Sequence, residues 1–171
     1  QSRSSAASDV YKRQDLKTVV KLAHDQGIKV VGDGVAYMAH DIADLKGIDI
    51  DFYAFSLYKT YGPHLALLYG KRELLEKTKN LNHEFLQGDV PYTLNPGGPN
   101  HEELACLSGI TDYYENVYNH HFGSDKSNLN KKGKKVFELI YDYEENLMQI
   151  LLDFLKLKKN VRLLGKTSHL R

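Results

Sequence analysis

The fold is decided by the segment Ile28-Lys29-Val30-Val31-Gly32-Asp33, a run rich in β-branched residues that ends in a carboxylate. It follows Gly27, and between Leu16 and Gln26 the apolar residues recur at helical spacing. A helix, a glycine turn, a buried strand and an aspartate at its carboxyl end form the αβ unit of a parallel or mixed sheet. Ligands of such sheets bind outside the carboxyl ends of the strands.

The rest of the chain continues this pattern. We predict strands over Ile50–Ser56 and Leu65–Tyr69, a short helix opening at Lys71, helices over Glu102–Val117 and Val136–Leu157, a surface excursion over Asn119–Lys134, and the start of a strand over Val161–Gly165. The predicted class is α/β, a three-layer sheet with flanking helices.

The composition argues against a nucleic-acid-binding, membrane-spanning or disulfide-bonded protein. The 171 residues have a formal charge of +1, which gives no basic excess for binding nucleic acid. The apolar runs are too short to span a bilayer, and no signal-like apolar stretch follows a basic start. The single cysteine, Cys106, excludes an internal disulfide, which suits a cytoplasmic protein.

Asp33 and Lys59 are the candidate chemical pair. They are 26 residues apart (59 − 33), and each follows a predicted strand, so neighbouring strands would place both at one sheet edge. An acid and a lysine are two of the groups that pyridoxal 5′-phosphate (PLP) chemistry requires. However, an aspartate that ends a strand more often caps a turn, and a lysine before a Gly-Pro turn is ordinarily solvated. Spacing alone does not identify PLP.

Three ordered motifs carry a resemblance. Val31–Ala36, Phe55–Pro63 and Pro96–Asn100 resemble the two cofactor motifs and the glycine-rich segment of class V aminotransferases, the fold-type I PLP group that includes the cysteine desulfurases. The likeness extends over residues 15–157 and is greatest to the cysteine desulfurase-like branch. It implies that Asp33 pairs with the pyridinium nitrogen, Ser56 and Tyr58 donate to the phosphate, and Lys59 forms the Schiff base.

The sequence departs from the desulfurases at two positions. Ala36 stands where desulfurases usually have a glutamine that bonds the cofactor's phenolic oxygen, and Gly98 stands where they have a threonine. Cys106 is not the desulfurase nucleophile by this resemblance, and its helical neighbours predict a buried apolar role. His40 is expected to fix a loop, and His101, His120 and His121 have no cysteine or carboxylate pattern around them that would define a metal site.

The resemblance also divides the chain. Residues 1–14 form a tail, of which residues 4–14 look like a translated sequencing adapter; residues 15–134 form part of the PLP-binding large domain; residues 135–171 form a connecting helix and the start of a truncated, small C-terminal domain. We therefore expect a fragment that is inactive alone.

The full protein is expected to act on a small α-amino acid through a Lys59 Schiff base, as a cytoplasmic homodimer. The alternative is a catalytically degenerate α/β interaction domain.

Overall fold

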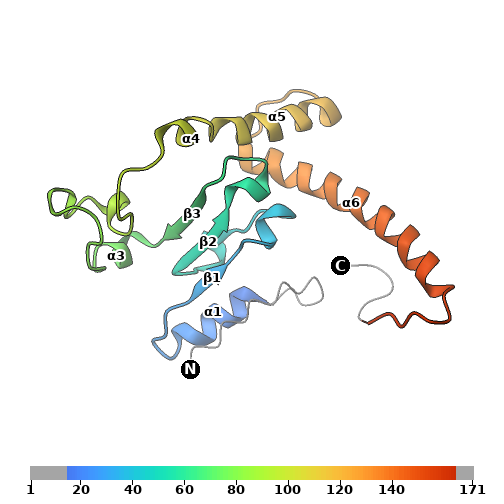
Figure 1. Cartoon of the computed structure of the whole chain (residues 1–171), viewed down its shortest axis with the longest axis horizontal. Coiled ribbons are helices and arrows are strands. Elements are labelled where there is room, and N and C mark those ends of the chain that lie inside the picture. The colour runs from blue at the N-terminus through green and yellow to red at the C-terminus, as the bar shows by residue number, and fades with distance from the viewer. Residues whose placement is uncertain (1–14, 165–171) are drawn as a thin grey trace.

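The computed structural model describes residues 15–164, in which helices flank one mixed sheet (Figure 1). The strands are β1 (Val31–Asp33), β2 (Phe52–Ser56) and β3 (Ala66–Gly70). The α-helices are α1 (Leu16–His24), α2 (Leu45–Ile48), α3 (Arg72–Leu75), α4 (His101–Ala105), α5 (Ser108–Phe122) and α6 (Leu129–Lys156). Short 3-10 helices are η1 (Tyr37–Ala39), η2 (Leu57–Thr60), η3 (Glu84–Leu86) and η4 (Val90–Tyr92). The predicted α/β class is confirmed; the adapter-like segment lies outside the described residues.

The sheet has the strand order β1-β2-β3, with β1 parallel and β3 antiparallel to β2. In this register Gly32 lies opposite Tyr53, and Asp33 lies opposite Ala54. Side chains alternate along a strand, and cross-strand partners project to the same face. Gly32 and Tyr53 therefore share one face of the sheet, and Asp33 and Ala54 share the other.

The hydrophobic core lies on the Tyr53 face, which α1 and α2 cover. Val20 of α1, Ile50 and Tyr53 are at most 3% exposed and form its centre. A Cβ atom at Gly32 would lie 2.7 Å from side-chain atoms of both Ile50 and Tyr53, so only glycine allows this close approach. The opposite face is open in the described part of the chain, where Val31 is 68% and Leu68 is 49% exposed.

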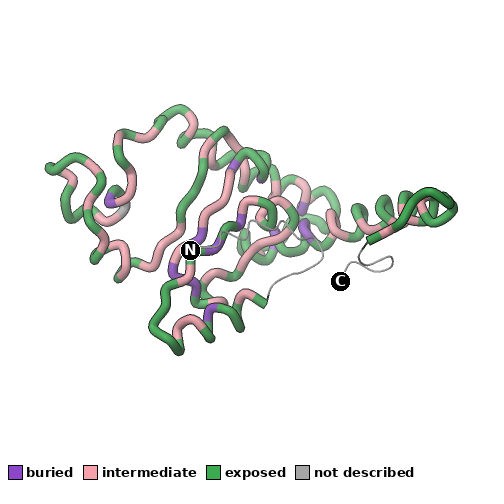
Figure 2. Tube along the Cα trace, turned by 60° about the horizontal axis from the view of Figure 1, so that its bottom comes forward, coloured by how far each residue is buried: buried purple, intermediate pink, exposed green. Residues whose placement is uncertain are grey.

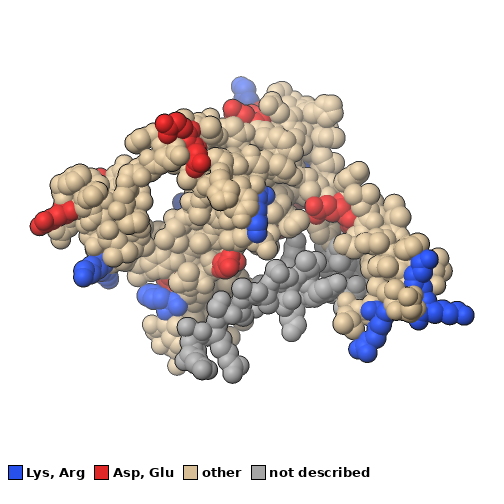
Figure 3. Space-filling model, viewed as in Figure 1, with Lys and Arg blue, Asp and Glu red and all other residues tan. Residues whose placement is uncertain are grey.

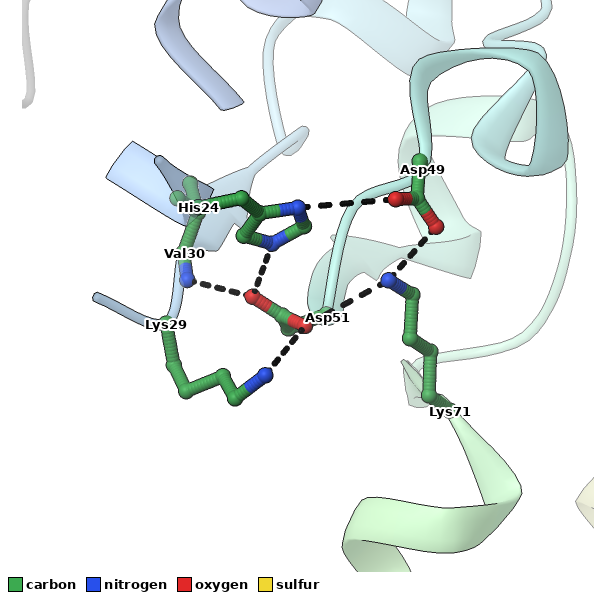
Figure 4. Close-up of polar contacts among 6 residues, drawn as sticks. All are labelled: His24, Lys29, Val30, Asp49, Asp51 and Lys71. Carbon is green, nitrogen blue, oxygen red and sulfur yellow. Dashed lines mark hydrogen bonds and ion pairs between the residues drawn. The ribbon is translucent and has the colours of Figure 1, made fainter. Parts of the chain in front are cut away.

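A buried carboxylate, Asp51, joins α1 to the sheet at the start of β2 (Figure 4). Its Oδ2 atom accepts the N–H of Val30 at 2.8 Å and lies 2.8 Å from Nε2 of His24. Its Oδ1 atom lies 3.6 Å from Nζ of Lys29 and 3.5 Å from Nζ of Lys71. Burial acts to raise the pKa of Asp51, but the hydrogen bonds from Val30 and His24 outweigh it and lower that pKa to about 2. The ionised side chain at the start of β2 thus connects α1, the segment before β1 and the segment after β3.

Helix α6 packs on α5 through its N-terminal half and then leaves the sheet (Figures 1 and 2). Val136 and Phe137 are buried, and a Cβ atom at Gly133 would lie 2.6 Å from Ile42 in the loop after β1. Towards the end of α6 the apolar side chains are exposed, with Ile150 at 69%. Within residues 15–164, no helix has the length and apolar character needed to cross a membrane. On the face in Figure 3, basic and acidic side chains form small, separate groups.

Two predicted helices have different bounds in the structure. Helix α6 begins at Leu129, seven residues before the predicted start at Val136 (136 − 129), because Asn128 caps it by accepting the N–H of Lys131 at 2.9 Å. The polar stretch predicted as a surface excursion therefore contains the end of α5 and the first turns of α6. The helix predicted over Glu102–Val117 is two helices, α4 and α5, which are separated at residues 106–107.

Two further predictions were wrong. Cys106 is exposed rather than buried: it is the C-cap residue of the short helix α4, and its thiol donates to the carbonyl of Glu102 at 3.2 Å. Residues 161–164 form no strand. They follow the projecting end of α6, where no described strand lies beside them to supply a hydrogen-bonding edge.

Candidate functional site

Asp33 is the last residue of β1, at the carboxyl end of the two parallel strands. Pairing continues one step further, because the N–H of Gly34 donates to the carbonyl of Ala54 at 2.8 Å. The Oδ1 atom of Asp33 accepts the N–H of Val35 at 3.0 Å, which orients the carboxylate. Its Oδ2 atom has no hydrogen-bond donor among residues 15–164, and the side chain is exposed. One carboxylate oxygen is therefore available to a ligand.

Ser56 ends β2, two residues after the partner of Asp33. The alternation of side chains places Ser56 on the same open face as Asp33 and Ala54. Ser56 is also the N-cap residue of η2, yet its side chain makes no capping hydrogen bond. Serine usually performs that role at an N-cap, so the half-buried hydroxyl is left for another acceptor.

Lys59 lies in η2, which is anchored on one side and open on the other. Leu57 and Thr60 are 7% and 5% exposed, and the hydroxyl of Thr60 donates to the carbonyl of Leu57 at 2.8 Å. Tyr58 and Lys59 are exposed. Nζ of Lys59 forms no hydrogen bond or ion pair within the described part of the chain. The anchored residues thus hold the backbone on both sides of Lys59, whose side chain is exposed.

The ring of Tyr58 stacks on His64, with centroids 4.8 Å apart and planes within 9°. This contact fixes the direction of the Tyr58 ring beside Lys59. Of the four predicted cofactor residues, Asp33 and Ser56 share one face of the sheet, and Tyr58 and Lys59 lie on the exposed side of η2, which follows Ser56 directly.

Tyr53 packs against this edge of the sheet from the face opposite Asp33. The sequence did not identify it as a site residue. A Cβ atom at Gly34 would lie 2.2 Å from ring atoms of Tyr53, so the ring packs directly on the backbone after Asp33. Burial, and secondarily the charge of Asp33, raise the pKa of Tyr53 to about 12. The phenol therefore stays neutral next to the Asp33 carboxylate. In the sequence, the signal for this contact is the pair of glycines at 32 and 34, which leave room for the aromatic ring of Tyr53.

Three other residues named in the sequence analysis are His40, Ala36 and Gly98. His40 fixes the loop after β1, as predicted, because its Nδ1 atom lies 3.3 Å from Oε2 of Glu144 on α6. Ala36 is exposed just before η1 and offers no polar side-chain atom. Gly98 lies in the loop before α4, and a Cβ atom there would meet nothing within 4 Å.

Comparison with known proteins gives one consistent result. A model of the family described as Aminotransferase class-V matches residues 11–150. The chain is 30% identical over 156 residues to the aminotransferase-like protein FGM3 of Gibberella zeae, covering 90% of this chain and 35% of that protein. It is 37% identical over 111 residues to the cysteine desulfurase CsdA of Escherichia coli, covering 58% of this chain and 28% of that protein.

A solved structure agrees with the sequence matches. The crystal structure of CsdA from Escherichia coli superposes with a TM-score of 0.57 at 28% identity, covering 85% of this chain and 35% of that one. The chain thus spans about a third of the length of these relatives. The resemblance read from the three motifs is confirmed, and the chain belongs to the class V aminotransferase family.

Proposed function

We propose that this chain carries the PLP-binding centre of a cysteine desulfurase-like enzyme that acts on an α-amino acid. Class V aminotransferases and cysteine desulfurases depend on PLP, which makes this cofactor the expected one. One observation carries the proposal. Asp33 and Ser56 end the two parallel strands on one face of the sheet, Lys59 follows three residues after Ser56, and each has a polar atom that the described chain leaves unused.

The residues present fit the chemistry of PLP. The free oxygen of Asp33 would accept a hydrogen bond from the protonated pyridine nitrogen. The hydroxyl of Ser56 would donate to the phosphate, with the Tyr58 phenol as a second donor. Lys59 would attach the cofactor through Nζ, which no ion pair in the described chain holds back.

The chain's own groups would then perform the proton chemistry. When bound, PLP supplies an electron sink for charge that develops at the substrate's α-carbon. The Asp33 carboxylate would keep the ring nitrogen protonated and so strengthen that sink. After the substrate's amino group displaces it, Lys59 would act as a neutral amine at Nζ and take the α-proton.

Ala36 and Gly98 bear on which branch of the family this is. Neither residue has a polar side chain, so position 36 would offer no hydrogen bond to the phenolic oxygen and position 98 would offer no hydroxyl to the phosphate. We therefore propose a relative of the desulfurases rather than desulfuration itself. A homodimer, a cytoplasmic location and inactivity of these 171 residues by themselves remain predictions.

The test is to locate the attached cofactor in the protein expressed from its complete reading frame. After incubation with PLP and reduction with borohydride, peptide mass spectrometry should find the pyridoxyl group on Lys59. Lys59→Ala should lose the visible absorbance of the bound cofactor, and Lys77→Ala, a change at another exposed lysine, should keep it. Attachment at a different lysine would remove Lys59 from the proposal. No attachment at all would instead favour the non-catalytic interaction domain.

A further inference from the structure

Tyr61 has an unusual backbone for its residue type. It lies two residues after Lys59, at the C-cap of η2, with φ 64° and ψ 19°. This left-handed conformation is the one for which glycine is the default residue, because a Cβ atom crowds the following carbonyl. A tyrosine keeps it only where the surroundings hold it, and such residues cluster at functional sites.

Tyr61 is 57% exposed, and the part of its ring that is covered lies against aromatic rings of α5. The ring centroids of Tyr61 and Tyr113 are 4.5 Å apart at an interplanar angle of 35°, and Tyr114 meets Tyr61 edge-on at 6.1 Å. Tyr114 in turn contacts Phe137 of α6 at 5.2 Å, and Phe137 is only 4% exposed. A continuous set of ring contacts therefore runs from the end of η2 to the buried part of α6.

The next residue is pressed against the same helix. A Cβ atom at Gly62 would lie 2.5 Å from Cδ1 of Ile110 on α5 and 3.0 Å from the carbonyl oxygen of Leu57. The N–H of Gly62 donates to that carbonyl at 2.9 Å and closes the η2 turn. The segment after Lys59 is thus packed on α5 by a ring and by a backbone without a side chain.

We propose that Tyr61 is a positioning residue for Lys59: its ring, docked on Tyr113 and Tyr114 of α5, fixes the end of η2 and with it the direction of the lysine amine. This inference rests on the proposed function, since it concerns how Lys59 meets the cofactor. The alternative is that the Tyr61 ring only stabilises the fold by packing. The two alternatives predict different effects of a glycine at this position on the affinity for PLP.

The test compares Tyr61→Phe and Tyr61→Gly in the protein expressed from its complete reading frame. Glycine relieves the left-handed backbone, which offsets part of the stability lost with the ring contacts, so the cofactor-free protein should still unfold in one cooperative transition. If the ring positions Lys59, Tyr61→Gly should still bind PLP at least about tenfold more weakly, because small misplacements of a reacting group are costly. The pH midpoint of the bound cofactor's visible absorbance should also move from the wild-type value. Tyr61→Phe keeps the ring contacts and loses only the hydroxyl contact with Tyr113, so its affinity should stay close to that of the wild type.

Two more variants complete the design. Tyr113→Ala removes the partner ring from α5 while the sequence of η2 stays intact, and it should reproduce the loss of affinity and the altered pH midpoint. Phe85→Ala removes an exposed ring that stacks on His83 in a different loop, and it should change neither.

The outcomes separate the two proposals. If the wild type binds PLP and both Tyr61→Gly and Tyr113→Ala bind it with wild-type affinity and pH midpoint, the inference about Tyr61 is overturned alone. If Tyr61→Phe loses as much affinity as Tyr61→Gly, the hydroxyl contact with Tyr113 holds the end of η2 instead of the ring, and docking of the ring is overturned. If the wild type takes up no PLP, the proposed function falls, and this inference falls with it.

Discussion

The ring of Tyr53 lies directly against the backbone of Gly34, so closely that a Cβ atom there would come within 2.2 Å of the ring. The contact sets the position of the chain where it leaves β1 after Asp33. It is made from the face of the sheet opposite Asp33, so the support of the site and the site itself occupy different faces.

Gly34→Ala should therefore destabilise the fold. The added methyl group must displace a ring that is 3% exposed, and overpacking of this kind costs about 1–3 kcal/mol. Urea unfolding followed by circular dichroism measures the change. Gly97→Ala is the matched control, since a Cβ atom there meets nothing within 4 Å, and it should change the free energy of unfolding by less than about 0.5 kcal/mol. Equal stability of the two variants would refute the close contact.

Ser56→Ala should weaken cofactor binding without weakening the fold. The hydroxyl caps nothing in η2, so its removal should leave the free energy of unfolding within about 0.5 kcal/mol of the wild type. Loss of one hydrogen bond to a charged phosphate should raise the Kd for PLP roughly tenfold, as measured by fluorescence titration. Ser108→Ala, at an exposed serine that begins α5, is the control. An unchanged Kd in Ser56→Ala would take Ser56 out of the phosphate site.

Asp51→Asn should be strongly destabilising. The change keeps the shape of the side chain but removes the buried negative charge that faces Lys29 and Lys71. Because Asp49 still pairs with Lys71 at 2.6 Å, we expect a cost of about 2 kcal/mol. Thermal or urea unfolding measures it. Asp25→Asn, at an exposed aspartate just after α1, should be nearly silent. A small effect at Asp51 would show that the ion pairs are replaceable by amide hydrogen bonds.

The same carboxylate predicts how stability depends on pH. Its pKa is lowered in the folded protein from 3.8 to about 2, so it contributes stability that is fully present above about pH 4. That contribution is lost as the pH falls towards 2, because the unfolded chain binds the proton first. Unfolding free energies measured across this range should converge for the wild type and Asp51→Asn. Parallel curves would contradict the assignment.

The sequence alone determined the features that depend on neighbours along the chain. The αβ unit ending at Asp33, the strand that leads into Lys59 and the Gly-Pro turn after it are encoded by β-branched runs and turn residues, and the structure shows each. The order of three motifs over most of the chain was enough to identify the family, because each motif lies within a short segment.

Only the tertiary structure decided the features that depend on distant contacts. Asp51 reads in the sequence as one residue of an apolar strand; its burial becomes tolerable only when His24 and Lys71 reach it from α1 and from the segment after β3. Cys106 has helical neighbours, yet it is exposed, as are the preceding residues Leu104 and Ala105 of α4. The left-handed Tyr61 is held by rings of α5, about fifty residues further along the chain (113 − 61). The physical reason is common to all three: hydrogen-bond caps and apolar periodicity act within a few residues, whereas burial and pairing of a side chain depend on segments that meet only in the folded chain.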